Sequence, residues 1–313
     1  MRSDALSLPG SPERPNEDWT ATALFAAEDR GAVVLLDGVT PPVGEDGCVH
    51  GVPWFVARLG GALTELSASR PDVSLSEILS LAIRRTADSH RVTCDLSHVR
   101  TPQATVVLAR WDGAVVEHLV LSDSVLLLEG PDGAVRAVLD DRLDRVPAEV
   151  LRSVAATDRL RNREGGFFTA AADPAVAERA VTGTVPRAEV RALAALTDGA
   201  SRWVDLFGEG DWTDCLGVLR AEGPPGLLRR VRRREAEDAG AGGVRRWKLH
   251  DDATAAYVEL GLPGLPELPG ASGLPGHPGL SELLEPSGLS GHPGLSEHPE
   301  LPGSPGIPGL PGY

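Results

Sequence analysis

Aspartates follow several apolar, strand-like runs of this chain. They occur in the segments LLDG (Asp37), VLSDS (Asp123), ALTDG (Asp198) and KLHDDAT (Asp251 and Asp252). A single aspartate after a strand is ordinary turn chemistry, because its carboxylate bonds the neighbouring backbone. Four such sites, together with Asn16-Glu17-Asp18 near the start, indicate a cation-binding site rather than turns alone. Carboxylates that gather at one sheet edge repel one another unless a cation neutralises them. Such oxygen ligands select Mg²⁺ or Mn²⁺, and two of these ions side by side activate a water and clamp a phosphate.

The order and spacing of these segments resemble the PP2C (PPM-type) metal-dependent protein serine/threonine phosphatases of bacteria. The resemblance covers most of residues 11–260, and each motif is short but follows an apolar run in the family's order. The matching segments are Asn16-Glu17-Asp18 for the opening N-E-D, Asp37-Gly38 for the central D-G, Thr105 in TPQATVVLAR for a buried T-x strand, Ser122-Asp123-Ser124 for G-D-S, Thr197-Asp198-Gly199 for S-D-G, and Asp251-Asp252-Ala253-Thr254 for the closing D-[DN]-x-T.

The resemblance implies a role for each acidic residue. Asp37 would bridge two metal ions, with Glu17 and the Gly38 carbonyl completing one site and Asp198 and Asp251 the other. Asp123, together with Asp198, matches the position of a weaker third metal in bacterial members. Asp18 would orient bound water from behind the ligands. The implied activity is hydrolysis of phosphoserine or phosphothreonine in proteins by a water that two Mn²⁺ or Mg²⁺ ions activate, with Asp37, Asp198 and Asp251 as the catalytic carboxylates.

Three departures from the family pattern bear on activity. The family's phosphate-gripping arginine stands four residues before the Glu, a position held here by Glu13, and the arginine is instead Arg14. The glycine-rich continuation after D-G is replaced by residues 39–42 (VTPP), and Ser122 replaces the glycine of G-D-S. These changes affect substrate binding and loop geometry more than metal binding. They keep open a second hypothesis, a catalytically silent phosphatase-like module that binds a signalling partner.

Composition narrows the partners and the compartment. The 313 residues carry 45 acidic and 30 basic side chains, a net charge of −15, which argues against a nucleic-acid-binding surface. We expect no membrane contact, because the chain has neither a secretory h-region nor a long apolar run. Three widely spaced cysteines (Cys48, Cys94 and Cys215) predict neither a disulfide framework nor a zinc knuckle, and the scattered histidines predict no histidine metal site. A cytoplasmic protein is the resulting expectation.

Periodicity predicts an α+β domain over residues 1–260. Helices are expected at 54–67, 74–93, 147–158, 201–207, 212–220 and 224–238, and strands at 31–36, 104–110, 114–121, 125–129, 134–139, 166–171, 190–196 and 253–260. Asp-Gly turns between apolar runs favour antiparallel hairpins. With the resemblance, this pattern indicates a four-layer α-β-β-α sandwich of two antiparallel sheets flanked by helices. In the arginine-rich segment 227–238, we expect Leu227, Leu228 and Val231 to face inward. We expect the arginines to be solvated or paired with Glu235, Glu237 and Asp238.

Residues 261–313 are a tripeptide repeat without Lys or Arg. Every third position is Gly or Glu, and the third residue of each triplet is mostly Pro or Ser. A collagen triple helix needs Gly at each such position, and five glutamates break that rule. We therefore predict a disordered low-complexity tail on a monomeric protein, and a collagen-like trimerising stalk is the weaker alternative.

Overall fold

A computed structural model describes residues 1–25, 29–240 and 250–261. These residues fall in one compact unit, Met1–Leu265. The predicted tail, apart from Gly261, lies outside the described residues. None of the described helices is both long and apolar enough to cross a bilayer.

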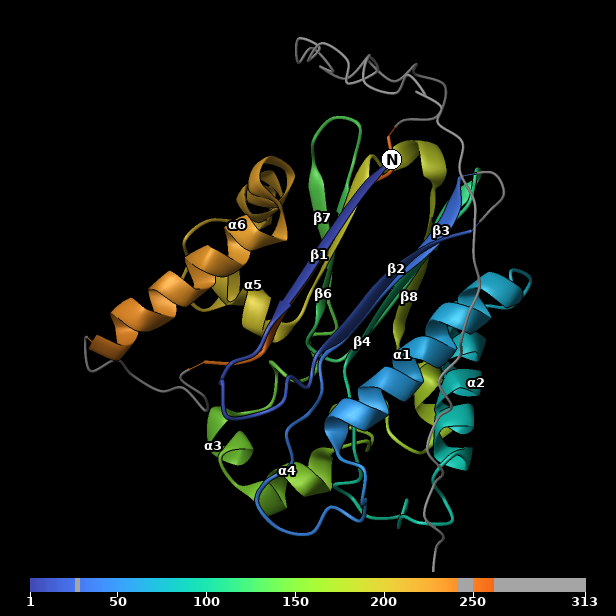
Figure 1. Ribbon diagram of the computed structural model, residues 1–313, viewed down its shortest axis with the longest axis vertical. Coiled ribbons are helices and arrows are strands. Elements are labelled where there is room, and N and C mark those ends of the chain that lie inside the picture. The colour runs from blue at the N-terminus through green and yellow to red at the C-terminus, as the bar shows by residue number, and fades with distance from the viewer. Residues whose placement is uncertain (26–28, 241–249, 262–313) are drawn as a thin grey trace, which may run out of the picture. The chain divides into compact units, whose positions relative to one another are not determined.

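Two five-stranded antiparallel sheets form the centre of the fold (Figure 1). The first has the order β1-β10-β9-β6-β7, with β1 Arg2–Leu8, β10 Ala253–Glu259, β9 Ala192–Leu196, β6 Val125–Glu129 and β7 Val135–Val138. The second has the order β2-β3-β4-β5-β8, with β2 Trp19–Phe25, β3 Arg30–Leu36, β4 Val106–Trp111, β5 Val115–Leu121 and β8 Val181–Pro186.

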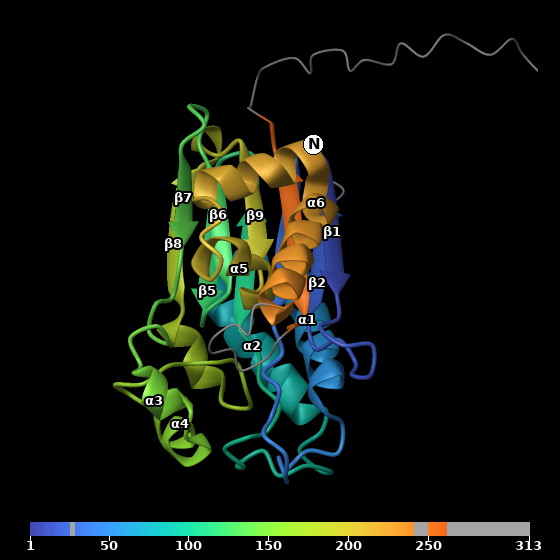
Figure 2. The ribbon, with the colours of Figure 1, turned by 90° about the vertical axis from the view of Figure 1, so that its left-hand side faces the viewer.

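Helices cover the outer faces of both sheets. α1 (Val52–Ser69) and α2 (Leu75–Asp88) pack on the second sheet, whereas α5 (Asp198–Asp205) and α6 (Trp212–Gly240) cover the first (Figure 2). Two short helices, α3 (Ala148–Leu151) and α4 (Val154–Leu160), lie beyond the strand ends, and 3-10 turns occupy Pro174–Arg179 and Arg187–Glu189. The predicted four-layer α-β-β-α sandwich is confirmed.

Successive side chains of a strand point to opposite faces of its sheet, and this explains the layers. In β3, Val34 and Leu36 join the core beneath α1 and α2, while Val33 and Leu35 face the other sheet. A third apolar cluster, which includes Val231 of α6, lies between the first sheet and its helices. Because both faces of these strands are buried, their sequences are continuous apolar runs rather than alternating ones.

Several predicted elements need correction. The strand expected at 166–171 contributes only the isolated bridges Arg161–Phe167 and Ala104–Ala170. The helix expected at 147–158 is two helices, because Ser153 caps a new one by accepting a hydrogen bond from the Ala156 amide. Strands β1, β2 and β8 were not predicted. β1 and β8 are sheet-edge strands, and several of their residues are exposed, which weakens the apolar signal.

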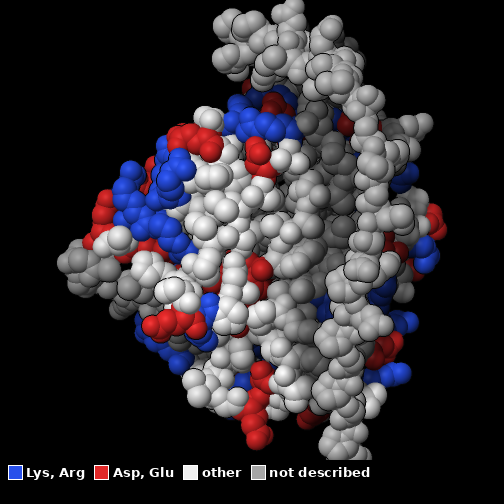
Figure 3. All heavy atoms as spheres, in the orientation of Figure 1, with Lys and Arg blue, Asp and Glu red and all other residues white. Residues whose placement is uncertain are grey.

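The interpretation of the arginine-rich segment is confirmed. Leu227, Leu228 and Val231 are fully buried, and Arg232, Arg233 and Arg234 form ion pairs with Glu235 or Glu237. Figure 3 shows arginines and acidic residues interspersed over α6. Gly223 kinks α6 at φ 68°, so that the segments predicted as two helices are two helical pieces joined at this residue.

Candidate functional site

The topology brings the acidic motifs to one end of the sandwich. Asp37 follows β3, and Glu17 and Asp18 precede β2, the antiparallel neighbour of β3. Asp198 follows β9, and Asp251 precedes β10, which pairs antiparallel with β9. In an antiparallel pair the end of one strand lies beside the start of its neighbour. Both pairs therefore present their carboxylates at the same end, together with Asp123 from the β5–β6 turn.

A cavity of about 550 Å³ opens at this end. Its acidic lining residues are Asp37, Asp123, Asp158, Asp198 and Asp251. Glu17 instead lines a smaller adjoining pocket with Arg14, Thr40, Asp251 and Asp252. Segments around α3 and α4 supply an apolar wall that includes Leu151, Val154 and Phe167.

Burial and mutual repulsion raise the pKa values of two of these carboxyls, Asp37 and Asp123. Burial is the larger cause for Asp37, whose pKa lies well above its ordinary value, and the charges of Asp198, Asp18, Asp123 and Asp251 add to it. Burial and the Asp198 charge raise the pKa of Asp123 to about 7. Carboxylates placed this way are destabilised in their charged form unless a cation lies among them.

Asp18 lies behind this layer. It is buried, and its Oδ2 accepts hydrogen bonds from the hydroxyls of Thr254 (2.7 Å) and Thr197 (3.1 Å). Its Oδ1 is buried without a protein partner in the structure. Burial raises the pKa of Asp18 to about 8 in spite of the Thr254 hydrogen bond. Asp18 thus has one oxygen fixed by the protein and one left to accept from a solvent molecule.

Asp252 organises the N-terminal motif, a role that the sequence did not reveal. Its Oδ1 accepts from the Gly10 amide and its Oδ2 from the Glu17 amide, each at 2.7 Å. Because both bonds cross from the last strand to the first segment, Asp252 fixes the position of Glu17. The Thr40 hydroxyl also donates to Glu17 Oε2.

Asp251 has an arginine partner that was also not predicted. The Arg202 guanidinium donates to Asp251 Oδ2 at 2.9 Å and to the buried Glu235 at 2.8 Å. The Nδ1 of His250 lies 2.8 Å from Glu235 Oε2 as well. His250 therefore belongs to an ion-pair group beside the cavity and lines only the smaller pocket.

Two glycines of the motifs are required by close contact. A Cβ on Gly38 would lie 2.4 Å from the Glu17 carbonyl oxygen, and a Cβ on Gly199 would lie 1.9 Å from the Asp252 carbonyl oxygen. Neither site admits a side chain without displacing backbone. In the β5–β6 turn, by contrast, Ser122 adopts φ 69° without being glycine, and the Asp140 carboxylate accepts a hydrogen bond from its amide. The replacement of the family's glycine therefore leaves the left-handed turn intact.

Two arginines line the cavity. Arg14, predicted from the sequence as the phosphate-binding residue, is exposed at its edge, in contact with both pockets. Arg161 also lines the cavity, lies over the Phe167 ring and donates to Gln103. Burial lowers the pKa of Arg161, and the nearby Asp158 and Asp123 oppose that shift. Arg161 follows α4 in a segment without a recognisable motif, so it could not be predicted from the sequence.

Solved structures with this fold include bacterial serine/threonine phosphatases. Stp1 from Staphylococcus aureus superposes with a TM-score of 0.53 at 11% identity, covering 83% of this chain and 94% of that one. PstP/Ppp from Mycobacterium tuberculosis gives 0.53 at 17% identity, covering 83% and 98%. The PstP catalytic domain in complex with two manganese ions gives 0.50 at 17% identity, covering 82% and 97%. The sequence itself matches no known family profile and no curated protein.

These similarities confirm the predicted resemblance at the level of the fold. The chain has the fold of the bacterial PP2C-type phosphatases, and one protein of that fold is crystallised with two manganese ions. The donor set here fits such ions, since it consists of carboxylate and carbonyl oxygens, and burial and the neighbouring negative charges destabilise the charged form of Asp37 at its centre. Behind this set, the buried Oδ1 of Asp18 has no protein partner in the structure.

Proposed function

We propose that this protein is a metal-dependent phosphatase that hydrolyses phosphoserine or phosphothreonine in proteins. The observation that carries the proposal is the convergence of aspartates from four separate segments on one cavity that two arginines also line. Carboxylates hold divalent cations and guanidinium groups bind phosphate, so the cavity combines the two recognition chemistries that phosphate-ester hydrolysis requires.

The residues that would hold two Mn²⁺ or Mg²⁺ ions are Glu17, Asp37, Asp198, Asp251 and the Gly38 carbonyl, with Asp123 available to a third ion. When bound, the ions supply an activated water nucleophile and neutralise phosphate charge. For Asp251, binding requires that the Arg202 guanidinium share or release its carboxylate.

The remaining roles belong to the chain itself. Arg14 and Arg161, which both line the cavity, bind the phosphate and orient it. Asp18 Oδ1 accepts a hydrogen bond from a solvent molecule and thereby orients it, because its Oδ2 is fixed by Thr254 and Thr197. Leu151, Val154 and Phe167 exclude bulk water from one wall.

A specific observation favours a second candidate function. The 2.9 Å bond from Arg202 to Asp251 places a cation beside a proposed ligand. If Arg202 keeps this carboxylate, the second metal site is incomplete and the fold serves as a phosphoprotein-binding module without turnover. Phosphate release distinguishes the two functions, because both predict binding and only the first predicts hydrolysis.

The test is phosphate release from a phosphothreonine peptide in millimolar Mn²⁺. We expect turnover in the wild-type protein and a loss of at least about a hundredfold in Asp37→Asn, since the carboxylate common to both metal sites is removed. Asp132→Asn is the matched control. It also lies in an Asp-Gly turn, its Oδ1 accepts from the Ala134 amide, and an asparagine oxygen can replace that bond. Equal, negligible rates in the wild-type and Asp37→Asn proteins would contradict the proposal.

A further inference from the structure

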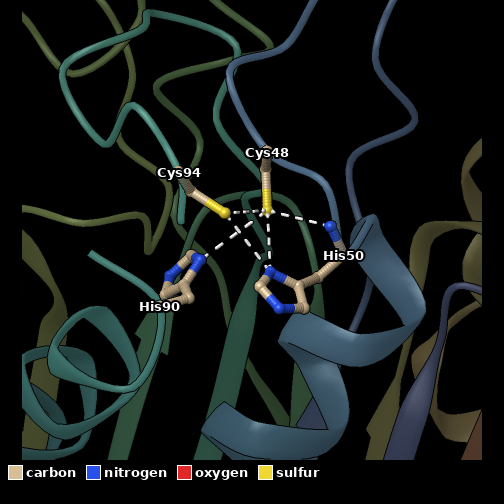
Figure 4. Close-up of side chains that lie close together, drawn as sticks. All are labelled: Cys48, His50, His90 and Cys94. Atoms are coloured by element: carbon tan, nitrogen blue, oxygen red, sulfur yellow. Dashed lines mark hydrogen bonds between the residues drawn. The ribbon is translucent and has the colours of Figure 1, made fainter. Parts of the chain in front are cut away.

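A second cluster of metal-binding side chains lies outside the aspartate cavity. It consists of Cys48, His50, His90 and Cys94, whose ligand atoms all lie within 4.8 Å of one another (Figure 4). The sequence predicted no zinc site, because the cysteines are widely spaced and the histidines form no local pair. That expectation missed the cluster, since each half, Cys-x-His and His-x-x-x-Cys, comes from a different loop.

Helix packing brings the two halves together. Cys48 and His50 immediately precede α1, whereas His90 and Cys94 follow α2, and α1 and α2 pack side by side on the second sheet (Figure 1). The Asp95 amide donates to the Gly47 carbonyl at 2.7 Å and joins the two loops directly. The cluster is thus a property of the tertiary fold.

The distances fit one tetrahedral ion. Cys48 Sγ lies 3.4 Å from Cys94 Sγ, 3.7 Å from His50 Nδ1 and 3.6 Å from His90 Nδ1. Cys94 Sγ lies 3.3 Å from His50 Nδ1. Tetrahedral zinc, with Zn–S about 2.3 Å and Zn–N about 2.0–2.1 Å, requires sulfur–sulfur separations of roughly 3.8 Å and sulfur–nitrogen separations of roughly 3.6 Å. These four separations lie within a few tenths of an ångström of the tetrahedral values, and all the ligand atoms lie within 4.8 Å of one another.

The surroundings hold these ligands in place. The His50 ring stacks on the Trp54 ring, with centroids 4.2 Å apart, and Trp54 also contacts the His90 ring at 4.9 Å. His90 is buried, and the His50 amide donates to Cys48 Sγ at 3.4 Å. Cys48 and Cys94 are free thiols rather than a disulfide.

We propose that Cys48, His50, His90 and Cys94 bind one structural zinc ion. Two thiolates and two imidazoles are a donor set that selects Zn²⁺, whereas the oxygen ligands around Asp37 select Mn²⁺ or Mg²⁺. Four protein ligands leave no open position, so the ion has a structural role. It clamps the loop that follows Asp37-Gly38, whose residues Val39–Pro42 line the aspartate cavity, to the loop after α2. The proposal is independent of the proposed phosphatase activity.

The first test is the zinc content of the full-length protein purified from zinc-supplemented cells without chelator. We expect one zinc per chain in the wild-type protein and a decrease of at least about tenfold in the Cys48→Ser/Cys94→Ser double variant. Cys215→Ala is the matched cysteine control, because Cys215 lies on the buried face of α6, and this variant should retain zinc. Asp37→Asn should also retain zinc, which excludes binding at the aspartates.

The second test does not depend on a variant that folds. Wild-type protein stripped of zinc and loaded with Co²⁺ should show thiolate-to-cobalt charge-transfer absorption and the strong visible bands of tetrahedral cobalt. The proposal would be overturned if the purified protein contained only background zinc and the cobalt-loaded protein showed no such absorption. A Cys48–Cys94 disulfide in the protein as purified, detected as a mass deficit of two hydrogens that reduction reverses, would overturn it as well.

Discussion

At the scale of single residues, the aspartate site is an arrangement of like charges that the fold alone does not stabilise. Burial is the larger cause of the raised pKa of Asp37, and the charges of four nearby aspartates add to it. Opposite charge comes from Arg202 at Asp251, at the edge of the group. The chain therefore holds these carboxylates together at the expense of stability, which is typical of a site built for a cation.

Manganese should accordingly stabilise the folded state. A ligand that binds only the native protein adds about 2.7 kcal/mol at a hundredfold excess over Kd, which corresponds to a rise in Tm on the order of 5–10 °C for a domain of this size. We expect millimolar Mn²⁺ to raise Tm by this amount and Asp37→Asn to abolish the rise. Thermal unfolding followed by circular dichroism, with Asp132→Asn as control, measures the difference. A Tm insensitive to both Mn²⁺ and chelator would show that the carboxylates do not form a metal site.

The two cavity arginines should act on substrate rather than on metal. Because Arg14 and Arg161 face the cavity from different segments, we expect Arg14→Ala and Arg161→Ala each to raise KM for a phosphopeptide by about tenfold, the loss of one charge-assisted contact. The Mn²⁺-induced rise in Tm should be unchanged in both. An unchanged KM in Arg14→Ala would assign the phosphate contact to Arg161 alone and refute the prediction for Arg14.

At the scale of elements, a buried histidine between the two sheets makes the stability of the fold depend on pH. His118 of β5 is two residues away from both Val116 and Val120, whose side chains face the other sheet. By the alternation of a strand, His118 lies on that same face. It is buried, its Nδ1 has no partner in the structure, and its ring lies close to Gly183 of β8. Burial, with a smaller contribution from the Arg136 charge, lowers the pKa of His118 from 6.5 to about 4.

The lowered pKa of His118 makes the folded state less stable at acidic pH. A folded-state pKa below the unfolded value means that the unfolded chain takes up the proton first, so the stabilisation is present above pH 6.5 and is lost as the pH falls towards 4. We expect His118→Gln to lose less Tm than the wild-type protein between pH 7 and about pH 4.5, in chelator to remove metal effects. Identical losses of Tm in the two proteins would contradict this.

At the scale of the whole molecule, the layers of the fold could be predicted from the sequence. Strands that are buried on both faces are continuous apolar runs, whereas in the helices the apolar residues recur with the helical period. The edge strands β1 and β8 were missed, since they carry exposed residues, and β2 lacked a recognised turn signal. The motif carboxylates could be predicted because each follows or precedes a strand. Arg161, Arg202 and the Cys48–Cys94 cluster could not, because their partners are brought to them only by tertiary packing.

The end of the described chain bears on the predicted independence of the tail. The buried Arg187 guanidinium donates to the carbonyls of Leu260 (2.7 Å) and Gly261 (3.1 Å). A cut directly after Leu260 would remove one of these acceptors. We therefore expect a chain ending at Leu265 to keep Mn²⁺ binding and any phosphatase rate within about twofold. A chain ending at Glu259 should lose about 1.5–3 kcal/mol for each charged hydrogen bond removed.

Sedimentation of the same chains tests the oligomeric state. We expect the full-length protein and the chain ending at Leu265 both to be monomers. A full-length trimer that becomes a monomer on truncation would instead support the collagen-like stalk.

The most direct test of the central claim is anomalous scattering from a crystal soaked in Mn²⁺. We predict two manganese peaks in contact with the Asp37 carboxylate, one shared with Glu17 and the Gly38 carbonyl and the other with Asp198 and Asp251. The Arg202 side chain should have moved away from Asp251 or share its carboxylate. Density that shows no manganese at Asp37, with the Arg202–Asp251 pair unchanged, would contradict the account.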